Sequence, residues 1–155
     1  MGNYVPSQQA ALADVRLGMR VDRPAENLPQ TATGNLFNVV GGRVAIVAIL
    51  GEVTEAIQNQ ACNTKLISTP TVGTAVDLCA AASIANKEVG SKLSITGTLS
   101  DALQIGNAGA LALPAKPVAV GAGVIGLNTA ANNTGKTKWS IWYVPIDDGA
   151  YIAKA

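Results

Sequence analysis

Histidine is absent from this 155-residue chain, which narrows the chemistry that its side chains can perform. A Ser-His-Asp or Cys-His arrangement needs an imidazole as general base, and imidazole is also the commonest protein ligand for metals. Carboxylates remain, and pairs of them catalyse glycoside hydrolysis. Glu52 and Glu55 form the only close glutamate pair, at the end of an apolar stretch, where solvated carboxylates are normal. We therefore expect no catalytic residue and no enzyme activity.

A second candidate for chemistry is the run AANNTGKT, residues 130–137, which ends like a phosphate-binding P-loop. The P-loop motif requires glycine where Ala130 stands, and it leads from a strand into a helix. Here the β-rich run KWSIWYV follows, so the two asparagines and Gly135 predict a hairpin turn instead. The later run DDG, residues 147–149, lacks the spaced carboxylates of a calcium loop and predicts a turn.

The two cysteines, Cys62 and Cys79, match neither zinc-ligand spacing nor a CxxC redox motif. A cysteine without a partner behaves as a small hydrophobe, so we expect two buried free thiols. The sequence contains no recognisable metal-binding or cofactor-binding motif, and we expect no metal and no cofactor.

The charge of the chain is low and scattered. Eleven basic and ten acidic residues give a net charge of +1, without the basic stripe that follows a phosphate backbone, so nucleic acid is not an expected partner. Charged residues make up 14% of the chain, against about 25% in typical soluble domains. Such a surface suits permanent contact with other protein chains, although a core rich in Ala, Val and Gly gives the same composition. The sequence shows no secretory leader and no membrane-spanning run, so we expect no membrane partner.

The first 33 residues predict an N-terminal arm. Ser7–Arg20 has a plausible N-cap and helical spacing of apolar residues, but it is too short to be stable alone. Its apolar positions are Leu12, Val15 and Met19. The prolines within Val21–Thr33 impose extended backbone on the residues before them, which predicts a strap without a core of its own. We therefore divide the chain into an arm, 1–33, and a body, 34–155.

The body has the pattern of an all-β domain, either a β-sandwich or a jelly-roll-like fold. Runs rich in Val, Ile, Leu and Thr alternate with clusters of Gly, Asn, Pro and Ser. The predicted strands are Asn35–Val40, Arg43–Val53, Thr64–Thr69, Val72–Leu78, Lys92–Leu99, Pro117–Leu127 and Thr137–Ile146. Ala80–Glu88 is compatible with one or two helical turns.

One predicted strand carries apolar side chains on both faces. In the run Val44–Leu50 no side chain is polar, whereas a half-exposed strand alternates apolar with polar residues. One face can meet the opposing sheet of a sandwich, and the second face needs the arm or another chain to cover it. Trp139, Ile141 and Tyr143 predict the core side of the last long strand, opposite Trp142 and Val144. We therefore expect a subunit interface made by Ala45, Val47, Ile49 and Trp142.

The segment LPQTATGNLFNVVGGRVAIVAILGEVTEAIQNQ and the ending WYVPIDDGAYI, in a chain of small-residue β segments, resemble the small virion proteins that decorate or cement the heads of tailed bacteriophages. This resemblance implies a β-rich, non-enzymatic protein on the outer capsid surface of the virion, made in the host cytoplasm. It also implies a homo-oligomer, a trimer in preference to a dimer. The implied partner is the major capsid protein, which an extended N-terminal arm clamps.

On that hypothesis the arm supplies the capsid contacts. Leu12, Val15 and Met19 would be its apolar contacts, and three arginines would pair with carboxylates on the shell, although simple solvation explains them as well. These arginines are Arg16, Arg20 and Arg23. The alternative hypothesis is a receptor- or glycan-binding head of a phage tail fibre or spike, which predicts an exposed aromatic or Asp/Asn cluster in a concavity.

Overall fold

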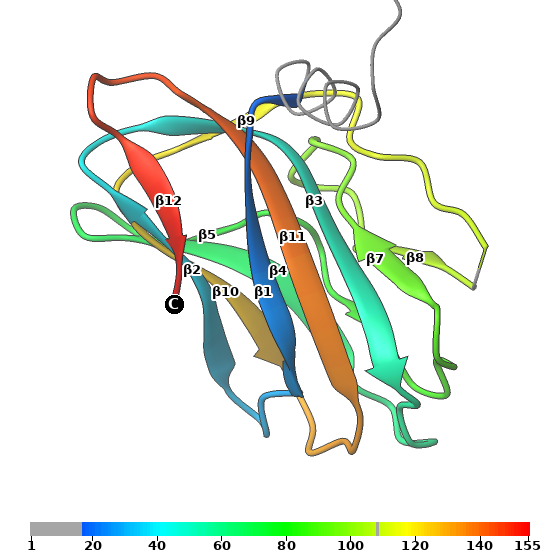
Figure 1. Cartoon of the computed structure of the whole chain (residues 1–155). Coiled ribbons are helices and arrows are strands. Elements are labelled where there is room, and N and C mark those ends of the chain that lie inside the picture. Colours follow the sequence, from blue (N-terminus) through cyan, green and yellow to red (C-terminus); the bar gives the residue numbers. More distant parts are fainter. Residues whose placement is uncertain (1–16, 108) are drawn as a thin grey trace, which may run out of the picture.

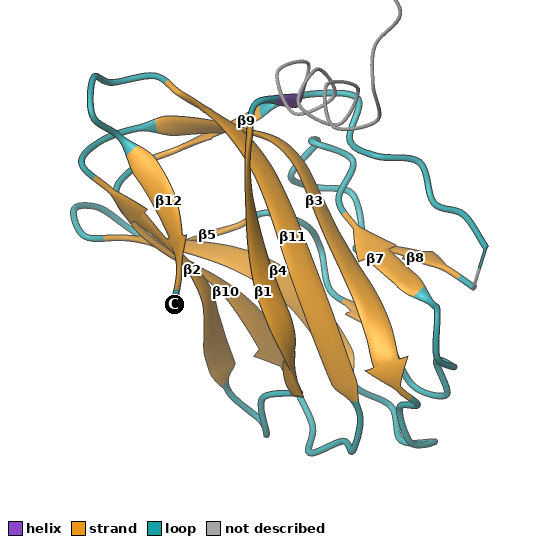
Figure 2. Cartoon of the chain, viewed as in Figure 1, coloured by secondary structure: helices purple, strands orange, loops and turns teal. Residues whose placement is uncertain are grey.

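The computed structural model describes residues 17–107 and 109–155, which fold into two antiparallel sheets packed face to face with almost no helix (Figures 1 and 2). Sheet A contains β1 (Met19–Asn27), β11 (Lys136–Pro145), β3 (Val44–Glu55), β7 (Lys92–Ser94) and β8 (Gln104–Gly106), with β9 (Val118–Val120) paired to β3. Sheet B contains β12 (Tyr151–Lys154), β2 (Thr33–Val40), β10 (Gly123–Thr129), β4 (Asn63–Pro70) and β5 (Val76–Asp77), with β6 (Ala82–Ser83) paired to β4. The predicted all-β fold is confirmed, and its form is a β-sandwich.

The longer strands alternate between the two sheets along the chain. β1 and β3 belong to sheet A, whereas β2 and β4 belong to sheet B, and β10 is likewise followed by β11 in the opposite sheet. Segment 130–135 therefore crosses from one sheet to the other, and the hairpin predicted there is wrong. Gly135 has φ +129 in this crossing, a conformation that favours glycine.

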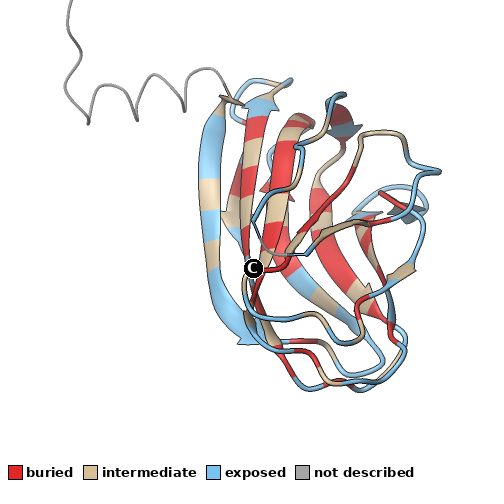
Figure 3. Cartoon of the chain, turned by 90° about the vertical axis from the view of Figure 1, so that its right-hand side faces the viewer, coloured by how far each residue is buried: buried red, intermediate tan, exposed pale blue. Residues whose placement is uncertain are grey.

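The core lies between the sheets, and buried residues alternate with exposed ones along the strands (Figure 3). Trp139, Ile141 and Tyr143 are buried, which confirms the predicted inner face of β11. Both cysteines are free and buried, as expected from their spacing. Within the described part of the chain, no helix is long and apolar enough to cross a membrane.

Strand β1 corrects the predicted boundary between arm and body. It is an edge strand of sheet A, paired along its length with β11, so the body begins at Met19 and not at residue 34. Val21 packs against the core and Leu28 is buried, because these apolar residues do have a core to join. Met19 and Arg20 are in this strand and not in the predicted helix Ser7–Arg20, whose earlier part lies outside the described residues.

Four further predicted segments differ from the structure in type or in length. Ala80–Glu88 contains β6 and no helix, because Ser83 and its neighbour pair with β4 and Asn86 adopts φ +59. In Val72–Leu78 and Lys92–Leu99 only β5 and β7 are strand. Pro117–Leu127 is two strands in different sheets, β9 and β10, which separate at Gly121 and its neighbour.

Gly51 of β3 faces the ring of Trp139. A Cβ placed on Gly51 would lie 2.7 Å from Trp139 Cη2, and Trp139 is only 1% exposed, so the ring cannot move aside. We expect Gly51→Ala to lower the free energy of unfolding by about 1–3 kcal/mol through overpacking. Gly121→Ala is the matched control, because a Cβ there meets no atom within 4 Å. Urea unfolding of both variants checks this, and equal stabilities would contradict the packing.

Arg43, just before β3, and Asp147, just after β11, form an ion pair at the same end of these two paired strands. The Asp147 carboxylate accepts hydrogen bonds from the Arg43 backbone N–H at 2.7 Å, from Nε at 3.0 Å and from Nη2 at 2.7 Å. Side-chain and backbone hydrogen bonds from Arg43 lower the pKa of Asp147 from 3.8 to about 2. Because the charged form is favoured in the folded state, the pair stabilises the fold above pH 3.8, and this contribution is lost as the pH falls through about 2.

We therefore expect Asp147→Asn to be less stable than the wild-type protein at neutral pH, with the difference shrinking between pH 3.8 and pH 2. Unfolding midpoints in urea across this pH range measure it. Asp148→Asn, which changes the net charge equally, serves as the control. A difference that stays constant down to pH 2 would show that the carboxylate does not act through this pair.

Candidate functional site

Val47 is the extra residue of a β-bulge in β3. In the pairing with β11, Ile46 lies opposite Tyr143 and Ala48 lies opposite Trp142, so Val47 has no residue of its own opposite it. A bulge places two residues against one and changes the alternation of the strand. In β3 the alternation of buried and partly buried residues is regular up to Ala48 and resumes one residue out of step after it.

This bulge explains why one of the four predicted interface residues is wrong. Ile49 is fully buried in the chain's own core, because the residues after the bulge have their inward and outward directions exchanged. Ala45 and Val47, which precede that change, are partly exposed on the outer face of sheet A. The sequence pattern contains no sign of the bulge, since Val44–Leu50 is apolar at every position.

Five apolar side chains gather on the outer face of sheet A, and we call them the apolar patch. Val144 of β11 lies opposite Ala45 of β3, which lies opposite Ala119 of β9, so three strands contribute one row. Trp142 and Val47, from the next positions on β11 and β3, are partly exposed beside this row. Val144 is 46% exposed. The structure thus brings together Ala45, Val47 and Trp142 from the prediction, and adds Val144 and Ala119.

The other end of this outer face is charged and internally paired. Lys136 Nζ lies 3.2 Å from Glu55 Oε2, and Lys138 Nζ lies 3.9 Å from Glu52 Oε1. The Ser140 hydroxyl donates a 2.7 Å hydrogen bond to Asp22. Exposed pairs of this kind contribute little stability each, but they make this end of the sheet hydrophilic. The apolar patch is therefore confined to the end of sheet A where β1 begins and β11 finishes.

The same contacts bear on the chemistry considered for Glu52 and Glu55. Each carboxylate faces a lysine of β11, which is the ordinary arrangement of a sheet surface. Among residues 17–107 and 109–155, no group of His, Cys, Asp and Glu could hold a metal ion.

Three of the six predicted capsid-contact residues lie in the described part of the chain. Leu12, Val15 and Arg16 lie outside the described residues. Met19 is 56% exposed at the start of β1. The side chain of Arg20, the next residue, is 48% exposed, and its Nε lies 3.6 Å from Asp22 Oδ2. Only these two of the described candidates present side chains to the surface.

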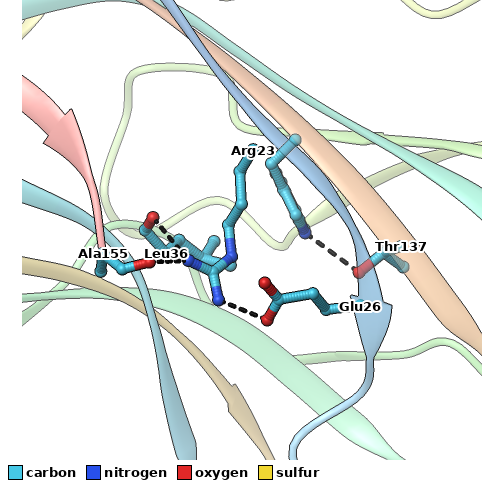
Figure 4. Close-up of polar contacts among 6 residues, drawn as sticks. Arg23, Glu26, Leu36, Thr137 and Ala155 are labelled. Atoms are coloured by element: carbon cyan, nitrogen blue, oxygen red, sulfur yellow. Dashed lines mark hydrogen bonds and ion pairs between the residues drawn. The ribbon is translucent and has the colours of Figure 1, made fainter.

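Arg23 joins the two sheets along the edge formed by β1 and β12 (Figure 4). Its Nη1 donates to the carbonyl oxygens of Leu36 in β2, at 3.3 Å, and of Ala155 after β12, at 2.5 Å. Its Nη2 donates to Glu26 Oε2 at 2.6 Å, and the side chain is only 12% exposed. A guanidinium with its donors engaged in this way is not available for the shell contact predicted for Arg23. We call this bridge between β1 and sheet B the seam. The sequence gives no sign of it, because the partners of Arg23 in sheet B are main-chain oxygens.

Of the hollows on the described residues, two lie at the open sides of the sandwich. One, of about 150 Å³, lies at the seam and is lined by Arg23, Glu26 and Thr137 among others. The second, of about 290 Å³, lies on the opposite side between β5 and β9 and is mostly apolar, with Val76, Leu78 and Val118 among its lining residues. Neither hollow brings two carboxylates together.

No family model, no curated protein and no solved structure matches this chain.

The two arginines of β1 form a matched pair for mutation. We expect Arg23→Ala to lower the free energy of unfolding by about 2–3 kcal/mol, because it removes the charge-assisted hydrogen bonds to Leu36, Ala155 and Glu26 of a side chain that is only 12% exposed. Arg20→Ala should change it by less than Arg23→Ala does, since the Arg20 side chain is 48% exposed and interactions of exposed charges contribute little each. Chemical unfolding checks both. Equal effects would contradict the structural role of Arg23.

Proposed function

We propose that this protein is a virion structural protein that decorates and stabilises the outside of a tailed-bacteriophage head. The observation that carries the proposal is the apolar patch on the outer face of sheet A, where three strands place partly exposed apolar side chains side by side. Exposed apolar patches on otherwise polar sheets are typical of protein interaction sites. The resemblance of the segment 28–60 and of the C-terminal run to phage decoration proteins supports the choice of partner.

In this proposal the activity is binding free energy distributed over many contacts. A protein that binds only the mature shell shifts the shell toward that state by mass action, and each bound copy adds to the effect. The major capsid protein is the partner, and a homo-oligomer, a trimer in preference to a dimer, raises avidity for a repeating lattice. No reaction and no cofactor are required.

The N-terminal residues supply the shell contacts in this proposal. Leu12, Val15 and Arg16 precede the body, and Met19 and Arg20 continue the same surface at the start of β1. Arg23 is left out, because its guanidinium holds the seam between the sheets. The contacting segment thus ends at Arg20 and not at residue 33.

The alternative of a fibre head is less well supported. It predicts an exposed aromatic or Asp/Asn cluster in a concavity, and for the Asp/Asn cluster the amide-rich loops at one end of the sandwich are the nearest match. Their amides bond to one another: Gln58 Nε2 donates to Gln60 and to the Asn132 carbonyl, and Asn133 Nδ2 donates to the Gln60 carbonyl. These groups stabilise the loops, and none of them lines either hollow described above.

Shells that lack this protein provide the test. Purified protein is mixed with them and imaged by electron cryo-microscopy, and we expect added density at every equivalent lattice position. Val15→Asp should reduce the occupancy at least tenfold, because a charge replaces an apolar contact. Thr69→Asp, at an exposed position of sheet B, is the matched control and should bind like the wild-type protein.

Absence of density on the shells, together with adsorption of the protein to host cells, would contradict the decoration role and favour the fibre head. Wild-type-like occupancy with Val15→Asp would show that the N-terminal segment does not make the contact.

A further inference from the structure

The apolar patch lies where the N-terminal segment joins the body. Gly18 immediately precedes β1 and has φ +92, and a Cβ placed on it would lie 3.1 Å from Val144 Cγ2. Val144 is the first member of the row that continues through Ala45 and Ala119. The chain before Gly18 therefore starts at one end of this row.

The length of that segment matches the width of the patch. The strands that carry the row follow the order β1, β11, β3, β9, so three inter-strand spacings of about 4.8 Å, or about 14 Å, separate Gly18 from β9. A helical segment rises about 1.5 Å per residue and crosses this width in about ten residues. Residues 1–16 supply enough chain to cross the whole row.

The side chains of the segment match the patch in chemistry. Leu12 and Val15 are spaced so that they share one face of a helix, with Arg16 at the border of that face and Asp14 on the opposite side. The outer face of sheet B, in contrast, is polar over much of its area. It carries Asn38, Lys65, Thr69 and Asn128.

We propose that in the free protein the segment 1–16 covers the apolar patch of its own chain, with Leu12 and Val15 against Val47 and Trp142. A second copy is the less suitable occupant, because stable interfaces use about 20–30 residues a side and the patch has five. A tethered segment also acts at an effective concentration in the millimolar range, which no second copy reaches at ordinary protein concentrations. The cover is a property of the free chain; in the proposed function Leu12 and Val15 contact the shell instead, so the segment leaves the patch when the protein binds.

Tryptophan fluorescence tests the cover in the full-length chain. The chain has two tryptophans, and Trp139 is 1% exposed, so acrylamide quenching reports mainly on Trp142. We expect Leu12→Ser/Val15→Ser to raise the quenching constant about twofold over the wild-type protein. Gln8→Ala/Gln9→Ala, in the same segment, should leave it unchanged. In a Trp142→Phe background the increase should disappear, and an unchanged constant in Leu12→Ser/Val15→Ser would overturn the proposal.

Disulfide trapping in dilute, shell-free solution identifies the occupant. We expect Leu12→Cys/Val47→Cys to form an intramolecular disulfide on mild oxidation, detected by mass spectrometry of the monomer. Leu12→Cys/Asn38→Cys, with the second thiol on the outer face of sheet B, should not. A covalent dimer would overturn the proposal in favour of a second copy, and absence of any bond would overturn it altogether. Because no shell is present, neither failure bears on shell binding.

Discussion

Strand β3 has apolar side chains on both faces, and the rest of the structure depends on how those faces are covered. Its inner residues, Ile46 and Ile49 among them, pack against sheet B and form the centre of the core. Burial of each large side chain stabilises the fold by about 1.5–3 kcal/mol. Its outer residues, Ala45 and Val47, remain partly exposed within the described chain. The same strand therefore supports the fold with one face and leaves apolar side chains partly exposed on the other.

The sandwich is closed by polar contacts at its edges. Arg23 joins β1 to β2 and to the end of β12, so its guanidinium bridges the two sheets along one open side of the sandwich. Pro24 and a bulge between Arg23 and Glu26 interrupt β1, which limits pairing with further strands along this edge. Growth by strand addition at the β1 edge is thereby disfavoured.

The fold class could be predicted because alternating apolar runs and turn residues are local signals. Apolar residues at every position of Val44–Leu50, however, conceal the bulge at Val47, so Ile49 was assigned to the wrong face. The predicted arm, 1–33, is too long because the prolines and charges in Val21–Thr33 are compatible with both a loose strap and an edge strand. Only the distant partner, β11, decides between them. Most pairings join strands far apart in the sequence, and no local pattern specifies those.

In the proposed arrangement of the free protein, the chain's own N-terminal segment covers the outer face of β3. Nuclear Overhauser effects between methyl groups in the free, methyl-labelled protein test it most directly. We expect nuclear Overhauser effects from the methyl groups of Leu12 and Val15 to those of Ala45 and Val47, with intensities that do not depend on protein concentration. Absence of these contacts, or their appearance only between differently labelled copies, would contradict it.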